Sequence, residues 1–168
     1  GDGHAGRAHG QRRGRGPAER SVRRLELELQ PDWVDGSARG VRRRSGWPSQ
    51  VAAAARVGVQ VCEIHTGPYA HAFHAAGRDI ERPAVQTELQ RVAAAGQQIR
   101  SLGMRFNAGH ALNYYNVQPI AALPGIRELH IGHAIVSRSV FVGLREAVAE
   151  MKRLMREARS EEHTSELQ

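Results

Sequence analysis

From residue 50 onward, apolar residues recur at helical spacing in some stretches and form short continuous runs in others. Helices are predicted at residues 50–58, 83–102, 116–123 and 138–158. The last helix is the clearest, because its apolar residues fall on one face and are expected to lie in the core. These residues are Leu144, Val148, Met151 and Met155. Glycines close the first two helices, as is common at helix ends.

Short apolar or β-branched runs separate these helices and predict strands. They cover residues 25–29, 59–67, 104–109 and 126–135. After Gly67-Pro68, a polar loop with Tyr69, His71 and His74 is predicted. The alternation of strands with helices predicts an α/β fold with a parallel sheet and right-handed crossovers. A parallel sheet needs both of its faces covered and its edge strands protected, and three strands after residue 50 are too few for this. The segment is therefore predicted to be part of a larger unit.

The first 50 residues differ in composition from the rest of the chain. The formal charge of the chain is +7, and residues 1–50 account for most of it with 11 arginines against 6 acidic residues. Residues 1–24 are so rich in glycine and arginine that they cannot bury enough apolar surface to fold. One interpretation is a basic nucleic-acid-binding protein acting through residues 1–50. Such arms usually interleave aromatic residues, and residues 1–32 contain none.

Several other classes are excluded by composition. Cys62 is the single cysteine, which excludes a disulfide framework and favours a reducing, cytoplasmic location. No apolar run approaches the length of a transmembrane helix, and the N-terminus lacks the apolar region of a secretory signal. A membrane partner is therefore not expected.

The loops that follow the predicted strands carry the candidate chemistry. Because the carboxyl ends of parallel strands meet at one edge of a sheet, polar residues there are expected to lie close together. These residues are Glu63, His65, His110 and His133. A carboxylate surrounded by imidazoles is suited to general acid–base catalysis. Gly132 and His133 precede a predicted helix, whose free N–H groups and dipole favour a phosphate.

The alternation of side chains along a strand predicts which way Cys62 and His130 face, and the histidines raise the alternative of a metal site. Cys62 should face away from Glu63 and act as a small core residue. His130 has the opposite parity to His133 and is predicted to face the helices. The imidazoles of His65, His110 and His133 could also hold zinc, as in a metal-dependent barrel hydrolase. No paired-histidine motif strengthens that alternative.

Three motifs carry a resemblance to a known family. They are EIHTGPYA at 63–70, RFNAGHALNYYNV at 105–117 and ELHIGHAIVSRSVFVGLREAVAEMKRLM at 128–155. From about residue 50 to 159 the sequence closely resembles the pyridoxine 5'-phosphate synthase family. The resemblance implies the C-terminal part of a truncated (β/α)₈ barrel. Strands six to eight of that barrel would lie at 59–67, 104–109 and 128–133.

The same resemblance implies a cytoplasmic, transferase-type enzyme that forms homo-oligomers when full length. The family condenses 1-deoxy-D-xylulose 5-phosphate with 3-amino-2-oxopropyl phosphate, giving pyridoxine 5'-phosphate, phosphate and water without a metal or organic cofactor. By motif, Glu63 would stabilise charge during ring closure and His110 would donate a proton. Gly132 and His133 would bind the phosphate of the amino-ketone substrate. Nucleic acid and membrane partners are not implied.

The sequence departs from the family in three places. Ala111 replaces a glycine that usually follows the histidine of NAGH. The motifs of the first five strands are absent from residues 1–49, which we interpret as a shifted reading frame. The tail at 160–168 resembles a translated adapter. An eight-stranded barrel without five strands cannot close, so this chain alone is predicted to be inactive.

Overall fold

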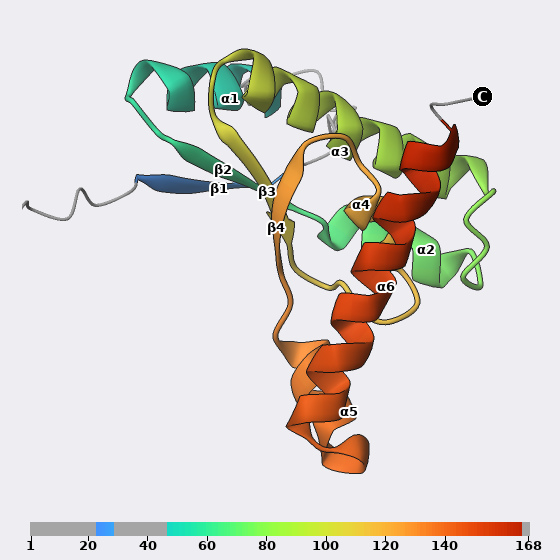
Figure 1. Ribbon diagram of the computed structural model, residues 1–168. Helices are drawn as coiled ribbons and strands as arrows, with labels where there is room; N and C mark the ends of the chain where they lie inside the picture. The colour runs from blue at the N-terminus through green and yellow to red at the C-terminus, as the bar shows by residue number, and fades with distance from the viewer. Residues whose placement is uncertain (1–22, 29–46, 166–168) are drawn as a thin grey trace, which may run out of the picture.

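The computed structural model describes residues 23–28 and 47–165, which contain an open parallel sheet in the order β1-β2-β3-β4 (Figure 1). The strands are β1 (Arg24–Glu28), β2 (Val61–His65), β3 (Arg105–Gly109) and β4 (Ile126–His130). Each neighbouring pair is parallel. The predicted α/β class, the parallel sheet and the short strand near residues 25–29 are thus confirmed.

Helices alternate with these strands along the chain. They are α1 (Trp47–Arg56), α2 (Gly67–Ala75), α3 (Pro83–Ser101), α4 (Val117–Ala121), α5 (His133–Val142) and α6 (Leu144–Ser165). The predicted helices at 50–58, 83–102 and 116–123 correspond to α1, α3 and α4. None of the helices in the described ranges combines the length and apolarity needed to cross a membrane.

Three predicted boundaries were wrong. Residues 67–75 form α2 instead of a loop, because Pro68 suits a first helical turn, where its missing N–H leaves no bond unmade. The strand predicted at 126–135 ends at His130, and α5 begins three residues later. The helix predicted at 138–158 is divided by Gly143, whose φ of 83° lies in the left-handed region that glycine tolerates.

The core lies between the sheet and α3. Val92, Ala95 and Ile99 of α3 are buried, and Gly96 leaves room for the Phe106 ring of β3. A side chain at Gly96 would collide with that ring, so the glycine sets how closely α3 approaches the sheet. Cys62 is fully buried, as predicted, and burial raises the pKa of its thiol.

The register of the strands brings polar residues into one row. Glu26 pairs with Glu63, Glu63 with Asn107, and Asn107 with Glu128 across the four strands. Successive side chains alternate between faces of a sheet, so these residues point away from the face that carries Cys62 and Phe106. The candidate site is built on this row.

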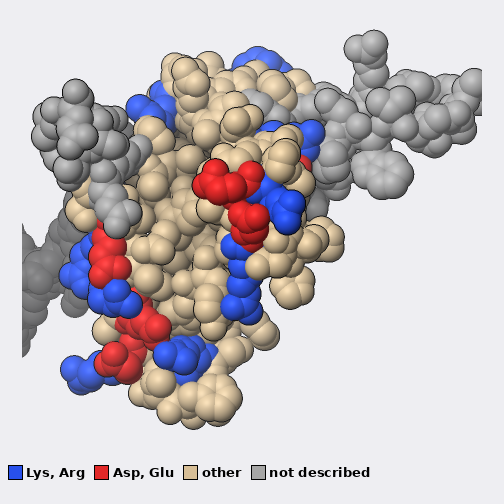
Figure 2. Space-filling view, turned by 90° about the vertical axis from the view of Figure 1, so that its right-hand side faces the viewer, with Lys and Arg blue, Asp and Glu red and all other residues tan. Residues whose placement is uncertain are grey.

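Helix α5 lies beyond the end of β4 and packs against α6 (Figure 1). None of its residues is buried, and the apolar side chains of Val136, Val140 and Phe141 are exposed. The corresponding lower end of the molecule is largely uncharged in Figure 2. Leu144, predicted to be in the core, is 62% exposed, because Gly143 places it at the start of α6, next to α5. Met151 of the same predicted stripe is buried.

Candidate functional site

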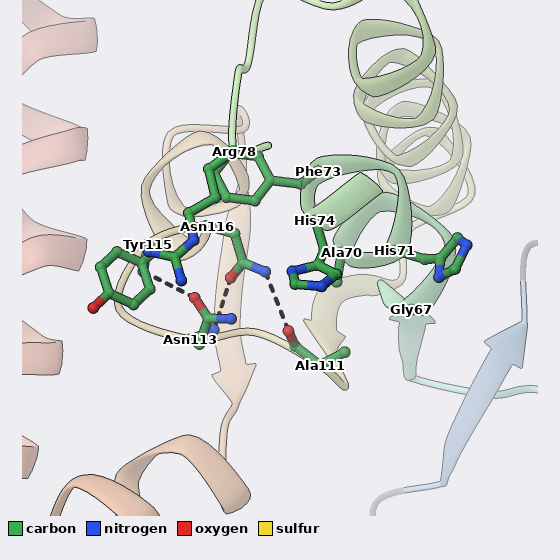
Figure 3. A pocket seen from close by; sticks show the side chains of 10 residues that line it. All are labelled: Gly67, Ala70, His71, Phe73, His74, Arg78, Ala111, Asn113, Tyr115 and Asn116. Carbon is green, nitrogen blue, oxygen red and sulfur yellow. Dashed lines mark hydrogen bonds between the residues drawn. The ribbon is translucent and has the colours of Figure 1, made fainter. Parts of the chain in front are cut away.

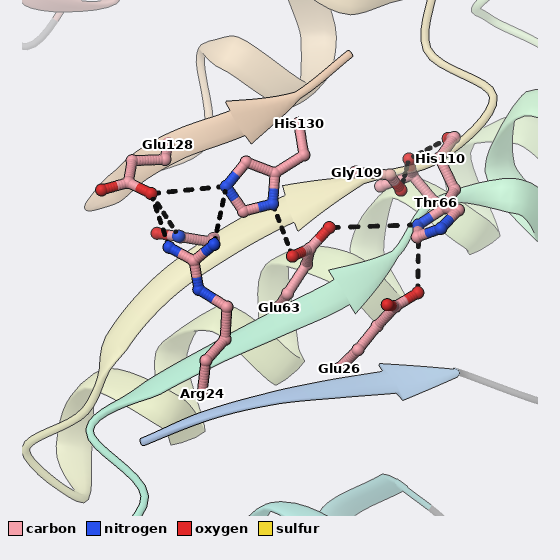
Figure 4. Close-up of polar contacts among 9 residues, drawn as sticks. Arg24, Glu26, Glu63, Thr66, Gly109, His110, Glu128 and His130 are labelled. Carbon is pink, nitrogen blue, oxygen red and sulfur yellow. Dashed lines mark hydrogen bonds and ion pairs between the residues drawn. The ribbon is translucent and has the colours of Figure 1, made fainter. Parts of the chain in front are cut away.

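Glu63 lies at the centre of the polar row, on β2, and is only 6% exposed (Figure 4). Its two carboxylate oxygens face imidazoles on opposite sides. Oε2 lies 2.5 Å from Nδ1 of His130, and Oε1 lies 3.9 Å from Nδ1 of His110. An uncompensated buried carboxylate would be costly, and the hydrogen bond with His130 offsets part of that cost.

His130 links Glu63 to a second acidic group. Its Nε2 lies 3.3 Å from Oε2 of Glu128, which also accepts hydrogen bonds from Arg24 at 3.0 Å and from the Asn107 amide at 2.9 Å. The hydrogen bond with His130 is the largest cause holding the pKa of Glu128 below its usual value. Both ring nitrogens of His130 therefore face carboxylates.

The prediction that His130 faces the helices was wrong. It rested on counting strand parity back from His133, but β4 ends at His130 and His133 belongs to α5. The ladder between β3 and β4 also shifts its register between Phe106 and Asn107. Consequently His130 pairs with Gly109 and shares the face of Glu63.

His110 is fixed by the end of β3 and by a threonine that the sequence did not single out. The buried Thr66 hydroxyl lies 2.5 Å from the carbonyl oxygen of Gly109 and 2.6 Å from that of His110. Its backbone N–H also donates to the Gly109 carbonyl. His110 has a φ of 73°, which turns the chain sharply at this point. Thr66 thus holds the turn that directs His110 toward Glu63.

His110 has two further neighbours. Its Nδ1 lies 3.1 Å from Oε1 of Glu26 on β1, and its ring stacks on His65 with centroids 4.4 Å apart. The structure therefore brings Glu63, His65 and His110 together, as the strand-end pattern predicted. Glu26 was missed because its segment carried no motif.

Gly132 and His133 lie apart from this cluster, at the start of α5. Gly132 is the residue before the helix, and its carbonyl accepts the N–H of Val136. Both residues are exposed, and space around Gly132 is open. The first N–H groups of this ten-residue helix have no acceptor within the helix itself. The position suits an anion, and no contact within the described residues joins His133 to Glu63 or His110.

The metal alternative needs a different set of ligands from the one predicted. Among the described residues, the ligand atoms of Glu26, His65 and His110 lie within 4.8 Å of one another, and His133 is not in this group. The Nδ1 of His65 accepts the Gly67 N–H, and His110 Nδ1 faces Glu26. The predicted trio of His65, His110 and His133 is therefore not assembled, which removes the basis of the hydrolase alternative.

The arrangement can move protons and hold charge. A buried carboxylate stabilises a cation that develops beside it, and an adjacent imidazole can donate or accept a proton. Glu63 and His130 lie on β2 and β4, and His110 directly follows β3 between them, so the sheet fixes their relative positions. This arrangement, near the carboxyl ends of parallel strands, suits acid–base chemistry.

Comparison with known proteins identifies the family. Residues 46–157 match the family model described as pyridoxal phosphate biosynthesis protein PdxJ. The chain belongs to this family. The match begins close to residue 50, where the composition of the chain changes.

Family members with curated names are highly similar. A pyridoxine 5'-phosphate synthase of Azoarcus sp. (strain BH72) is 77% identical over 110 residues, which is 66% of this chain and 44% of that protein. The synthase of Dechloromonas aromatica (strain RCB) is 76% identical over 111 residues, again 66% and 44% of the two chains. The synthase of Rhodopirellula baltica is 57% identical over 108 residues, or 64% and 41%. The chain thus spans less than half the length of these relatives.

Proposed function

We propose that the full-length protein to which this segment belongs is a pyridoxine 5'-phosphate synthase. It would condense 1-deoxy-D-xylulose 5-phosphate with 3-amino-2-oxopropyl phosphate and release pyridoxine 5'-phosphate, phosphate and water. The observation that carries the proposal is the buried Glu63 carboxylate held between His110 and His130. The high identity to the synthases of Azoarcus sp. and Dechloromonas aromatica supports the same reaction.

Each site residue has a proposed role. Glu63 stabilises positive charge on nitrogen-containing intermediates, because its carboxylate lies in a largely buried position. His110 donates a proton to the group that leaves as water or phosphate. Gly132 and His133 bind the phosphate of the amino-ketone at the start of α5. No step of this scheme requires a metal or an organic cofactor.

The chain itself is proposed to be an incomplete barrel. In this interpretation β2, β3 and β4 are strands six to eight, and α6 is the closing helix. The edge of β2 that β1 covers and the open edge of β4 are where the rest of the barrel would pair. We propose that the chain alone is inactive. The full-length protein would be a cytoplasmic homo-oligomer whose partners are phosphorylated small molecules.

We also propose that residues 1–49 come from a shifted reading frame and that residues 160–168 are a foreign tail. The strand β1 falls within the first segment, but an exposed sheet edge can accept any short alternating strand. Most of the basic segment invoked for nucleic-acid binding lies outside the described residues. Translation of the gene in its other two frames should restore a family-like strand upstream of residue 50. Failure of both frames to do so would refute this proposal.

A chimera tests the proposed activity. Residues 50–159 would replace the matched segment of the Azoarcus sp. synthase, and formation of pyridoxine 5'-phosphate from both substrates would be measured. We expect the chimera to be active and the purified 168-residue chain to be inactive. A folded chimera without activity would contradict the assignment of the site. Turnover by the isolated chain would contradict its proposed incompleteness.

A further inference from the structure

A cavity of about 320 Å³ lies beside the acid–base cluster but outside it (Figure 3). Its walls come from α2, from the turn that follows α2, and from the segment between His110 and α4. The volume is at the lower end of the range of small-molecule sites. Neither Glu63 nor His110 lines it, so the proposed reaction leaves this cavity unassigned.

The polar side chains around the cavity are cationic or neutral. Arg78, His71 and His74 line it, and no aspartate or glutamate does. The nearest acid in the sequence, Asp79, is held elsewhere. Its carboxylate pairs with Arg82 at 3.1 Å and accepts the N–H of Glu81. The cavity therefore favours a negatively charged ligand.

Arg78 is the strongest single indication of such a ligand. Its guanidinium lies 4.0 Å from the centroid of the Tyr115 ring, and within the described part of the chain no carboxylate or carbonyl accepts its hydrogen bonds. Its φ of 70° is unusual for a residue with a side chain. Such strained residues persist where the surrounding structure holds them, and they concentrate at ligand sites. The stacking on Tyr115 orients a cation whose donors remain open.

Asn113 contributes a second fixed donor. Its Oδ1 accepts the N–H of Tyr115, and its own N–H is accepted by Oδ1 of Asn116. Asn116 in turn donates to the carbonyl of Ala111. The Asn113 amide nitrogen makes no hydrogen bond within the described residues and is left to meet a ligand. Figure 3 shows Asn113 and His74 on either side of the Asn116–Ala111 hydrogen bond.

The remaining walls are apolar. Ala70 and Phe73 of α2 are buried, and the methyl group of Ala111 completes this side. The lining thus combines the donors of Arg78 and Asn113 with hydrocarbon from Ala70 and Phe73. A ligand with one anionic group and a short carbon skeleton matches this combination.

We propose that this cavity binds a small phosphate monoester. The phosphate would accept hydrogen bonds from the Arg78 guanidinium, the Asn113 amide and His74. The carbon portion would pack on Phe73 and Ala70. The site is separate from the proposed active site, and its existence does not depend on the proposed reaction.

The test is a titration of the isotope-labelled 168-residue chain, followed by NMR. Inorganic phosphate and glycerol 3-phosphate would be used in separate arms. We expect saturable shifts at the amides of Arg78, His74 and Asn113 in both arms, with tighter binding of the monoester. Arg78→Gln should weaken binding about tenfold or more, because a charge-assisted hydrogen bond is lost. The control is Arg56→Gln, an exposed arginine that ends α1 at the opposite end of the sheet.

Several outcomes would overturn the proposal. One is the absence of saturable shifts at these amides, and another is equal binding by Arg78→Gln and the unsubstituted chain. Shifts confined to Gly132 and His133 would assign the phosphate to α5 instead. Equal affinities for inorganic phosphate and glycerol 3-phosphate would contradict the proposed packing of the carbon skeleton on Phe73 and Ala70. An unstructured chain would also contradict the proposal, because the cavity requires α2 to pack beside residues 111–116.

Discussion

His130 Nδ1 lies 2.5 Å from Oε2 of Glu63, although the two residues belong to strands that are not neighbours in the sheet. They meet across Gly109 of the intervening strand β3. A side chain at Gly109 would collide with Oε1 of Glu63 and lie 3.1 Å from Cβ of His130. The glycine of the NAGH motif therefore makes room for the pair that centres the site.

The first prediction concerns His130. Replacing it with alanine leaves the buried Glu63 carboxylate without its nearest hydrogen-bond donor. We expect His130→Ala to lower the free energy of unfolding by about 1–3 kcal/mol. Urea denaturation followed by circular dichroism measures the change. The control is His133→Ala, an exposed residue, which should change stability by less than about 0.5 kcal/mol. Equal effects of the two substitutions would mean that Glu63 does not depend on His130.

The second prediction concerns Gly109. A methyl group at this position forces apart Glu63 and the backbone of β4. We expect Gly109→Ala to destabilise the fold by about 1–3 kcal/mol, as overpacking does. The matched control is Gly132→Ala, since Gly132 has open space and no positive φ. Thermal unfolding of both variants measures the difference. A stable Gly109→Ala variant would show that the side chains of Glu63 and His130 do not meet across β3.

The third prediction concerns Ala111, the position where the family usually has glycine. Its φ of 56° lies in the left-handed region, which costs a residue with a side chain roughly 1–2 kcal/mol. Glycine also adds entropy to the unfolded chain, so we expect Ala111→Gly to stabilise the fold by no more than about 1 kcal/mol. Ala94→Gly, on the exposed face of α3, should instead destabilise by about 1 kcal/mol. Denaturant midpoints measure both effects, and destabilisation by Ala111→Gly would argue against the positive φ.

The fourth prediction concerns pH. Hydrogen bonding to His130 lowers the pKa of Glu128, with smaller contributions from Asn107 and Arg24. A lowered pKa means that the stabilisation is present above the usual glutamate pKa and is lost as the pH falls through the folded-state value. Glu128 is half exposed, so the effect should stay below about 1 kcal/mol. Urea midpoints of the unsubstituted chain and Glu128→Gln should differ at pH 7 and converge as the pH falls below the folded-state pKa of Glu128. A constant difference would contradict this linkage.

The sequence predicted the structure best where the spacing of apolar residues within one segment determined its helix or strand. Helix α3, the three strands after residue 50 and the buried Cys62 followed from apolar spacing and parity. The meeting of Glu63, His65 and His110 followed from the rule that parallel strands end at one edge. These features depend on local pattern and on topology.

The missed features depend on contacts between distant segments. His130 was assigned to the wrong face because the parity was counted from His133, and the sequence does not mark that β4 ends before that residue. Thr66 acts by holding two carbonyls more than 40 residues away. Glu26 acts only through its place in the register of β1. The residue pattern did contain one usable signal, since Glu128 and His130 share parity two positions apart.

The most direct test of the central claim replaces Glu63 by glutamine in the chimera that carries residues 50–159. If Glu63 stabilises developing charge, pyridoxine 5'-phosphate formation should fall by about 100-fold or more while the fold is retained. Glu88→Gln, which removes a partly buried carboxylate of α3 paired with Arg91, should leave the rate unchanged. A Glu63→Gln chimera with the same rate as the Glu88→Gln control would contradict the placement of the active site.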